Sequence, residues 1–148
     1  MKKTLFIALC LLSVACTSQT RKQGATVVST SVKSVTNTEA PFIIGEGSVP
    51  GSEPLGTKNI GVINEGEVLE VSFNIKNDRE IPLIIFNAKA SCGCTSVSYD
   101  AEPIKKGETR AINVTYNSKG KSGQQMVFIN LLTDDGDYTI RLNLFVKK

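Results

Sequence analysis

The fold is decided by a stretch near the C-terminus, Tyr138-Thr139-Ile140-Arg141-Leu142-Asn143-Leu144-Phe145-Val146. Every second residue from Tyr138 to Val146 is apolar, and the polar residues Thr139, Arg141 and Asn143 stand between them. Side chains of a β-strand point alternately to its two faces. The pattern therefore predicts a strand that buries one face and exposes the other.

The same alternation occurs in residues 69–75 and 112–116. Residues 83–86 and 126–132 are nearly continuous apolar runs, which are typical of central strands covered on both faces. A helix would need apolar residues three and four positions apart, and no stretch of helical length after Cys16 has them. The sequence therefore predicts an all-β domain.

Between these stretches lie short segments rich in Gly, Asp, Asn, Lys and Ser, which are typical of turns. They are residues 77–80, 105–108, 118–123 and 134–137. The last of them, Asp-Asp-Gly-Asp, lacks the spaced carboxylates of a calcium loop, and we expect a hairpin turn there. About ten residues per strand and turn predict an immunoglobulin-like antiparallel β-sandwich of about seven strands.

The N-terminus has the pattern of an export signal. Lys2 and Lys3 precede an apolar run at residues 5–12, which has the length of a secretory signal and is too short for a membrane-spanning helix. The following Ser13-Val14-Ala15-Cys16 resembles a bacterial lipobox, with Ser13 where Leu is more common. We expect residues 1–15 to be removed as a signal peptide and Cys16 to carry a covalent lipid, which would anchor the protein to a membrane.

The mature chain divides into two parts. Residues 16–40 are rich in Ser, Thr, Gln and Lys and predict a flexible tether, and residues 41–148 contain the sandwich domain. The residues after Cys16, Thr17-Ser18-Gln19-Thr20, lack the acidic run that resembles a surface-export signal. The expected location is therefore the bacterial cell envelope, with the domain facing the periplasm.

Composition and charge argue against a nucleic-acid-binding protein and against a hydrolase with a histidine-containing triad. Without Lys2 and Lys3, 15 basic and 14 acidic residues remain, and they form no basic stripe of the kind that binds nucleic acid. The chain contains no His, so the commonest base of a hydrolase triad is absent. We expect a non-enzymatic module that binds an envelope protein or has a structural role, with no cofactor and an undetermined oligomeric state.

Cys92-Gly93-Cys94 is the motif with the most chemical potential. If Cys10 is removed with the signal and Cys16 is acylated, these are the two thiols that remain. A disulfide between them requires a turn at Gly93, because residues two apart in an extended strand lie about 6.6 Å apart at Cα. Such a small ring is expected to be strained and easily reduced, as in an exchange centre.

Two other interpretations of the pair remain open. The thiolates could hold Cu(I), a soft metal that sulfur suits; a closed zinc site within one chain is excluded because His is absent and Met126 is the single mature Met. Alternatively, Cys92 and Cys94 could simply pack as small apolar side chains at a turn. The alternative function is therefore a thiol-based redox or Cu(I)-binding envelope protein.

Five segments form a recognisable set: Phe73-Asn74-Ile75-Lys76-Asn77, Pro82-Leu83-Ile84-Ile85, Ser91-Cys92-Gly93-Cys94-Thr95, Pro103-Ile104-Lys105-Lys106-Gly107-Glu108 and Ile112-Asn113-Val114-Thr115-Tyr116. Together they resemble a family of bacterial exported proteins, frequent in Bacteroidota, that carry the domain of unknown function 1573. The resemblance covers residues 57–146, and Lys106 departs from it, since Pro is more frequent there. It implies an immunoglobulin-like fold, similar to major sperm protein and periplasmic pilus chaperones, and no established activity.

Overall fold

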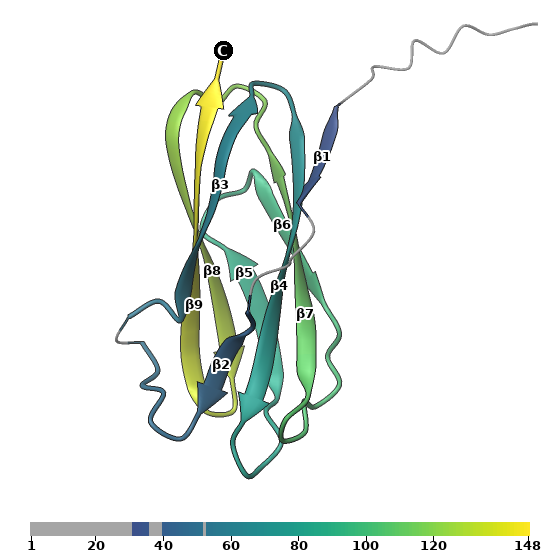
Figure 1. Cartoon of the computed structure of the whole chain (residues 1–148), viewed down its shortest axis with the longest axis vertical. Coiled ribbons are helices and arrows are strands. Elements are labelled where there is room, and N and C mark those ends of the chain that lie inside the picture. Colours follow the sequence, from purple (N-terminus) through teal and green to yellow (C-terminus); the bar gives the residue numbers. More distant parts are fainter. Residues whose placement is uncertain (1–30, 36–39, 52) are drawn as a thin grey trace, which may run out of the picture.

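The computed structural model describes residues 31–35, 40–51 and 53–148, which form two β-sheets packed against each other (Figure 1). Sheet A contains β1 (Val32–Val35), β2 (Phe42–Gly45), β4 (Val68–Asp78), β6 (Thr95–Tyr99) and β7 (Thr109–Asn117). Sheet B contains β3 (Gly56–Asn64), β5 (Ile85–Ala90), β8 (Gly123–Thr133) and β9 (Gly136–Lys147). The predicted all-β sandwich is confirmed.

Strand directions and strand number differ from the prediction. Sheet A has the order β1-β4-β7-β6, with β2 pairing a later part of β4, and sheet B has the order β3-β9-β8-β5. The pairs β1–β4, β2–β4 and β3–β9 are parallel, and the others are antiparallel. Both sheets are therefore mixed, and the described chain has nine strands where about seven antiparallel ones were expected.

β1 accounts for one of the additional strands. It lies within residues 16–40, which the composition predicts as a tether, and Val32–Val35 pair in register with residues 68–71 of β4. Most of its side chains are exposed, so no alternating pattern marks it in the sequence. The paired part of the chain therefore begins before residue 41. The predicted signal peptide and Cys16 lie outside the described residues.

The strands predicted from alternation are confirmed, and their apolar faces meet between the sheets. Phe73 on β4 and Leu142 on β9 are both fully buried. Sheet A also buries Leu69, Val71, Ile75, Ile112, Val114 and Tyr116, and sheet B buries Val127, Ile129, Leu131, Tyr138, Ile140, Leu144 and Val146. Each large apolar side chain contributes about 1.5–3 kcal/mol of burial free energy, so this shared interior holds the two sheets together.

The composition of the continuous apolar runs predicts strands covered on both faces. In the structure these strands are covered on one face only. β8 is central within its sheet, yet the side chains of Met126 and Leu132 are 52% and 47% exposed. β5 is an edge strand, and Phe86 is 59% exposed at a register shift between Ile85 and Asn87. The reason is that each sheet packs one face on its partner and leaves the other to solvent.

A buried polar side chain fixes each end of the sandwich. At one end, the fully buried Asn77 donates from Nδ2 to the carbonyls of Ile81 (2.9 Å) and Ile104 (2.7 Å), and its Oδ1 accepts from the Arg79 amide (2.9 Å). At the other end, the buried Ser118 Oγ lies 2.8 Å and 2.7 Å from the carbonyl oxygens of residues 64 and 67. These contacts tie neighbouring turns together.

Replacing Asn77 by Ala removes three hydrogen bonds that lie in buried or partly buried surroundings. We expect the free energy of unfolding to fall by about 2–4 kcal/mol in urea denaturation. Asn113→Ala is the matched control, because Asn113 is exposed on β7 and bonds to Ser72 at the surface; its cost should stay below about 1 kcal/mol. Equal losses in the two variants would refute the structural role given to Asn77.

Candidate functional site

The Cys-Gly-Cys motif lies in the crossing from sheet B to sheet A. β5 ends at Ala90 and β6 begins at Thr95, so residues 91–94 make the crossing. The Ser91 amide donates to the carbonyl of Phe128 on β8 (2.8 Å), and the Phe128 amide donates to Ser91 Oγ (3.0 Å). At the other end, the amide of Asn117 on β7 donates to the Cys94 carbonyl (2.9 Å). The crossing is thus attached to both sheets.

Cys92 and Cys94 are joined by a disulfide in the structure. Their Cα atoms are 5.3 Å apart, within the usual range for a bridged pair. The amide of Thr95 donates to the Cys92 carbonyl (3.2 Å), which closes a turn around Gly93. Both cysteines are partly buried and pack against the core.

Gly93 stands at the turn as predicted, but the turn does not require a glycine. Its φ lies outside the left-handed region, and a Cβ added there would meet no atom within 4 Å other than those of its chain neighbours Cys92 and Cys94. Gly107, in contrast, has a φ of 78°. The absence of a side chain at Gly93 therefore does not relieve backbone strain.

The two sulfur atoms have different surroundings. The amide of Cys94 lies 3.3 Å from Cys92 Sγ. Thr95 Oγ1 lies 3.3 Å from Cys92 Sγ and 3.8 Å from Cys94 Sγ. A disulfide sulfur carries no hydrogen, so the Thr95 hydroxyl must be the donor. Cys92 Sγ is therefore the sulfur with the closer hydrogen-bond donors.

Cys94 also lines a depression in the protein surface, and Cys92 does not. The depression is bordered by Gly93, Thr95, Ser96, Asn117 and Lys119. Its walls combine hydroxyl and amide groups, the apolar Val68 and one cationic side chain, and it lies at the start of the edge strand β6.

A metal centre has no support from other side chains near this turn. Among residues 31–35, 40–51 and 53–148, no group of three or more His, Cys, Asp or Glu side chains is placed to hold a metal ion. In the disulfide, neither sulfur is a thiolate, so Cu(I) binding by Cys92 and Cys94 would first require reduction.

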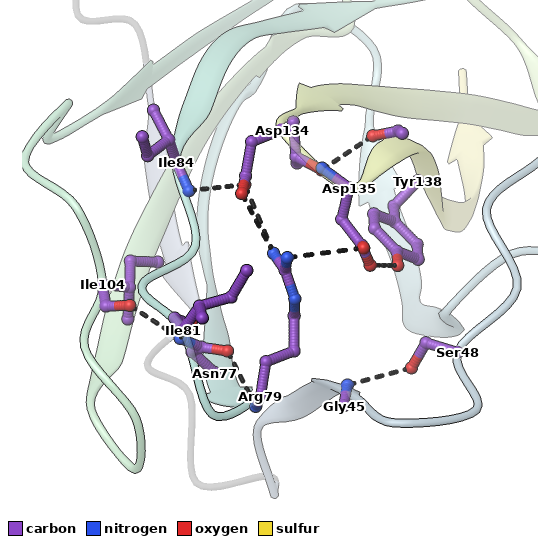
Figure 2. A network of polar contacts seen from close by, with 12 residues as sticks. Gly45, Ser48, Asn77, Arg79, Ile81, Ile84, Ile104, Asp134, Asp135 and Tyr138 are labelled. Carbon is purple, nitrogen blue, oxygen red and sulfur yellow. Dashed lines mark hydrogen bonds and ion pairs between the residues drawn. The ribbon is translucent and has the colours of Figure 1, made fainter.

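A second polar cluster lies at the end of the sandwich fixed by Asn77 (Figure 2). Residues 134 and 135 form the two-residue turn between β8 and β9, as expected for a hairpin. The Arg79 guanidinium forms ion pairs with Asp134 (3.3 Å) and Asp135 (3.5 Å), and Asp134 also accepts from the Ile84 amide (2.8 Å). These contacts attach the hairpin to the loop after β4, and the position of Arg79 carried no recognisable signal in the sequence.

Tyr138 completes this cluster. Its hydroxyl donates to Asp135 Oδ2 (2.5 Å). Burial of the ring, together with this hydrogen bond, raises the pKa of Tyr138 above its usual value. The hydroxyl is therefore a hydrogen-bond donor at neutral pH and no base. Because Arg79 is also paired, the cluster stabilises this end of the sandwich and offers no reactive group.

The membrane anchor predicted at Cys16 cannot be placed, because residues 1–30 lie outside the described part of the chain. Within the part that is described, no helix has the length and apolar character needed to cross a membrane.

Comparisons with known proteins concern the sandwich. A family model described as "Protein of unknown function (DUF1573)" matches residues 56–147. A comparison with curated protein sequences gives no match.

Two solved structures are similar in fold. A protein of unknown function from Porphyromonas gingivalis is 15% identical, with a TM-score of 0.52, over 60% of this chain and 43% of its own. The secreted serine protease VesC from Vibrio cholerae is 12% identical, with a TM-score of 0.51, over 60% of this chain and 21% of its own. This chain thus spans less than half of either protein. At these identities the likeness concerns the fold alone.

Proposed function

The chain belongs to the DUF1573 family of proteins of unknown function, and on that premise we propose that it is a lipid-anchored, non-enzymatic module of the bacterial cell envelope. In this proposal, the lipid on Cys16 holds the protein at the membrane with its domain in the periplasm. The sandwich binds an extended segment of another envelope protein along the open edge of β6. The observation that carries the proposal is the unprotected character of this edge.

Edge strands invite pairing with other chains, and proteins protect them with charged side chains, prolines, bulges or covering segments. In the described part of the chain, four of the five edge strands have such protection. β1 carries Lys33, and β3 carries the inward-facing Lys58 and a register shift. β5 carries Lys89 and another register shift. β2 follows Pro41, and the ring of its first residue, Phe42, packs against Gly56 of β3.

β6 differs from all of these strands. Its sequence Thr-Ser-Val-Ser-Tyr has no charge, no proline and no glycine, and it pairs with β7 without a register shift. Ser96 and Ser98 are exposed. Strands of this kind accept a partner strand through main-chain hydrogen bonds, a mode called β-augmentation.

The backbone of β6 is oriented for such pairing. In an antiparallel ladder, alternate residues direct their amide and carbonyl groups toward the neighbouring strand. The bond from Asn117 to the Cys94 carbonyl sets this alternation, so Ser96 and Ser98 bond toward β7. The amide and carbonyl of Val97 then point away from the sheet. A partner strand that pairs there would also lie next to the disulfide turn.

Site-specific photo-crosslinking tests the docking proposal. A photo-reactive amino acid at Ser98, in the full chain produced in its native envelope, should give an adduct of one defined mass. The same amino acid at Asn130, exposed on the central strand β8, is the control and should give none. Ser96→Lys should abolish the adduct at position 98, because a lysine on the edge opposes strand pairing. The absence of an adduct from position 98, or equal adducts from both positions, would reject the proposal.

The lipid anchor has its own test, which uses the two N-terminal cysteines as a matched pair. Cys16→Ser removes the acyl acceptor, so we expect the protein to move from the membrane fraction to the soluble fraction of disrupted cells. Cys10→Ser alters only the predicted signal peptide and should leave the protein in the membrane fraction. Acyl chains contribute about 0.8 kcal/mol per buried methylene, so their loss should be decisive. Continued membrane association of the Cys16→Ser protein would contradict lipidation.

The Cys92–Cys94 disulfide supports a second candidate, a thiol-based role. A bridge that closes a loop of one intervening residue removes little entropy from the unfolded chain, so it is a weak structural staple. It also lies at a partly exposed turn, where another thiol can reach it. Exchange of electrons with thiols uses the disulfide as it stands. Capture of Cu(I) would use its reduced form.

A further inference from the structure

We propose that the Cys92–Cys94 disulfide exchanges with external thiols in one direction: the incoming thiolate attacks Cys94 Sγ, and Cys92 leaves as the thiolate. The substrate class is the cysteine thiol of a peptide or protein. This inference rests on the second candidate function, the thiol-based role, and is independent of docking along β6.

The surface depression beside the disulfide favours attack on Cys94. Cys94 lines this depression, and Gly93 next to it is exposed. Lys119 borders the same depression, so its charge attracts an approaching thiolate. Cys92 takes no part in lining this depression, and its Sγ is approached by the Cys94 amide and the Thr95 hydroxyl.

The same donors make Cys92 the better leaving group. In thiol–disulfide exchange, the thiol with the lower pKa leaves faster. Hydrogen bonds to a charged form stabilise that form and shift the pKa accordingly. The Cys94 amide and the Thr95 hydroxyl both lie 3.3 Å from Cys92 Sγ. The corresponding distance from Thr95 Oγ1 to Cys94 Sγ is 3.8 Å. Negative charge that develops on Cys92 is therefore met by two donors.

The reaction balances with two thiols. The first thiol loses its proton to solvent, and its sulfur forms a bond to Cys94 Sγ as the Cys92–Cys94 bond breaks. The electron pair of the broken bond goes to Cys92. A second thiolate then attacks the sulfur of the first and releases Cys94. The two external thiols become one disulfide, and Cys92 and Cys94 become a dithiol, with protons taken from water.

Trapping the first intermediate tests the direction. The oxidised full-length protein is mixed with reduced glutathione as the probe, and the reaction is stopped within seconds by iodoacetamide. Fragment mass spectrometry then locates both labels. We expect glutathione on Cys94 and the carbamidomethyl group on Cys92, with the reverse product about tenfold rarer or less.

Each other outcome overturns the inference in a distinct way. Equal labelling, or glutathione mainly on Cys92, would reject the direction while preserving a thiol-based role. A lack of reaction would reject the thiol-based role as well. The positive control is oxidised glutathione, which must exchange with the same probe under the same conditions. Neither result would bear on the β6 crosslinks.

Variants at Thr95 and Thr139 separate the hydrogen-bond contribution from general effects of replacing a threonine. Cys94→Ser leaves Cys92 as a single thiol at this site, and its pKa can be read from the pH dependence of alkylation. In this Cys94→Ser background, Thr95→Val, which preserves the β-branched shape, should raise the pKa of Cys92. In the chain that keeps both cysteines, Thr95→Val should slow glutathione exchange several-fold. Thr139→Val, the same substitution on β9 in the other sheet, should change neither quantity. An unchanged Cys92 pKa in the folded Thr95→Val protein would contradict the role of Thr95.

Discussion

The structure depends on a short crossing between its two sheets. Residues 91–94 must take the chain from the edge of sheet B to the edge of sheet A, and each end of the crossing bonds to a central strand of the sheet it adjoins. The Cys92–Cys94 disulfide and the bond from the Thr95 amide to the Cys92 carbonyl fold the crossing into a tight turn. β6 begins directly after this turn and pairs with β7 alone, so the disulfide and the open edge lie next to each other.

The rest of the sandwich provides a rigid support for that turn. The apolar faces of β4, β7, β8 and β9 form the interior, while Asn77 and Ser118 bind the turns at opposite ends. Arg79, Asp134, Asp135 and Tyr138 add a paired polar cluster at the Asn77 end (Figure 2). These polar groups are satisfied by partners within the fold. By contrast, Cys94 lines a surface depression at the start of the edge strand β6.

Much of this arrangement could be predicted from local pattern. Alternation identified β4, β7 and β9, since the period of two is a property of each strand by itself. Strand pairing depends on residues far apart in the sequence, and this explains where prediction from local pattern differs from the structure. The additional strand β1 has no apolar alternation. The apolar side chains of Phe86 and Met126 lie at solvent-facing positions. The sequence predicts the Cys-Gly-Cys motif as a candidate site, and the structure joins its two cysteines in a disulfide at the crossing. The surroundings of the two sulfur atoms could not be predicted, because they depend on the position of Thr95 and on a turn whose two ends bond to different sheets.

The proposed thiol-based role makes one claim about the fold: the sandwich does not need the disulfide in order to stay folded. The most direct measurement is the free energy of unfolding of the oxidised and the reduced chain, determined by urea denaturation with and without a phosphine reductant. The chain-entropy model for so short a loop predicts a loss of no more than about 2 kcal/mol on reduction, with the β-sheet circular dichroism spectrum preserved. Unfolding of the domain on reduction would contradict the claim and identify the disulfide as a structural staple.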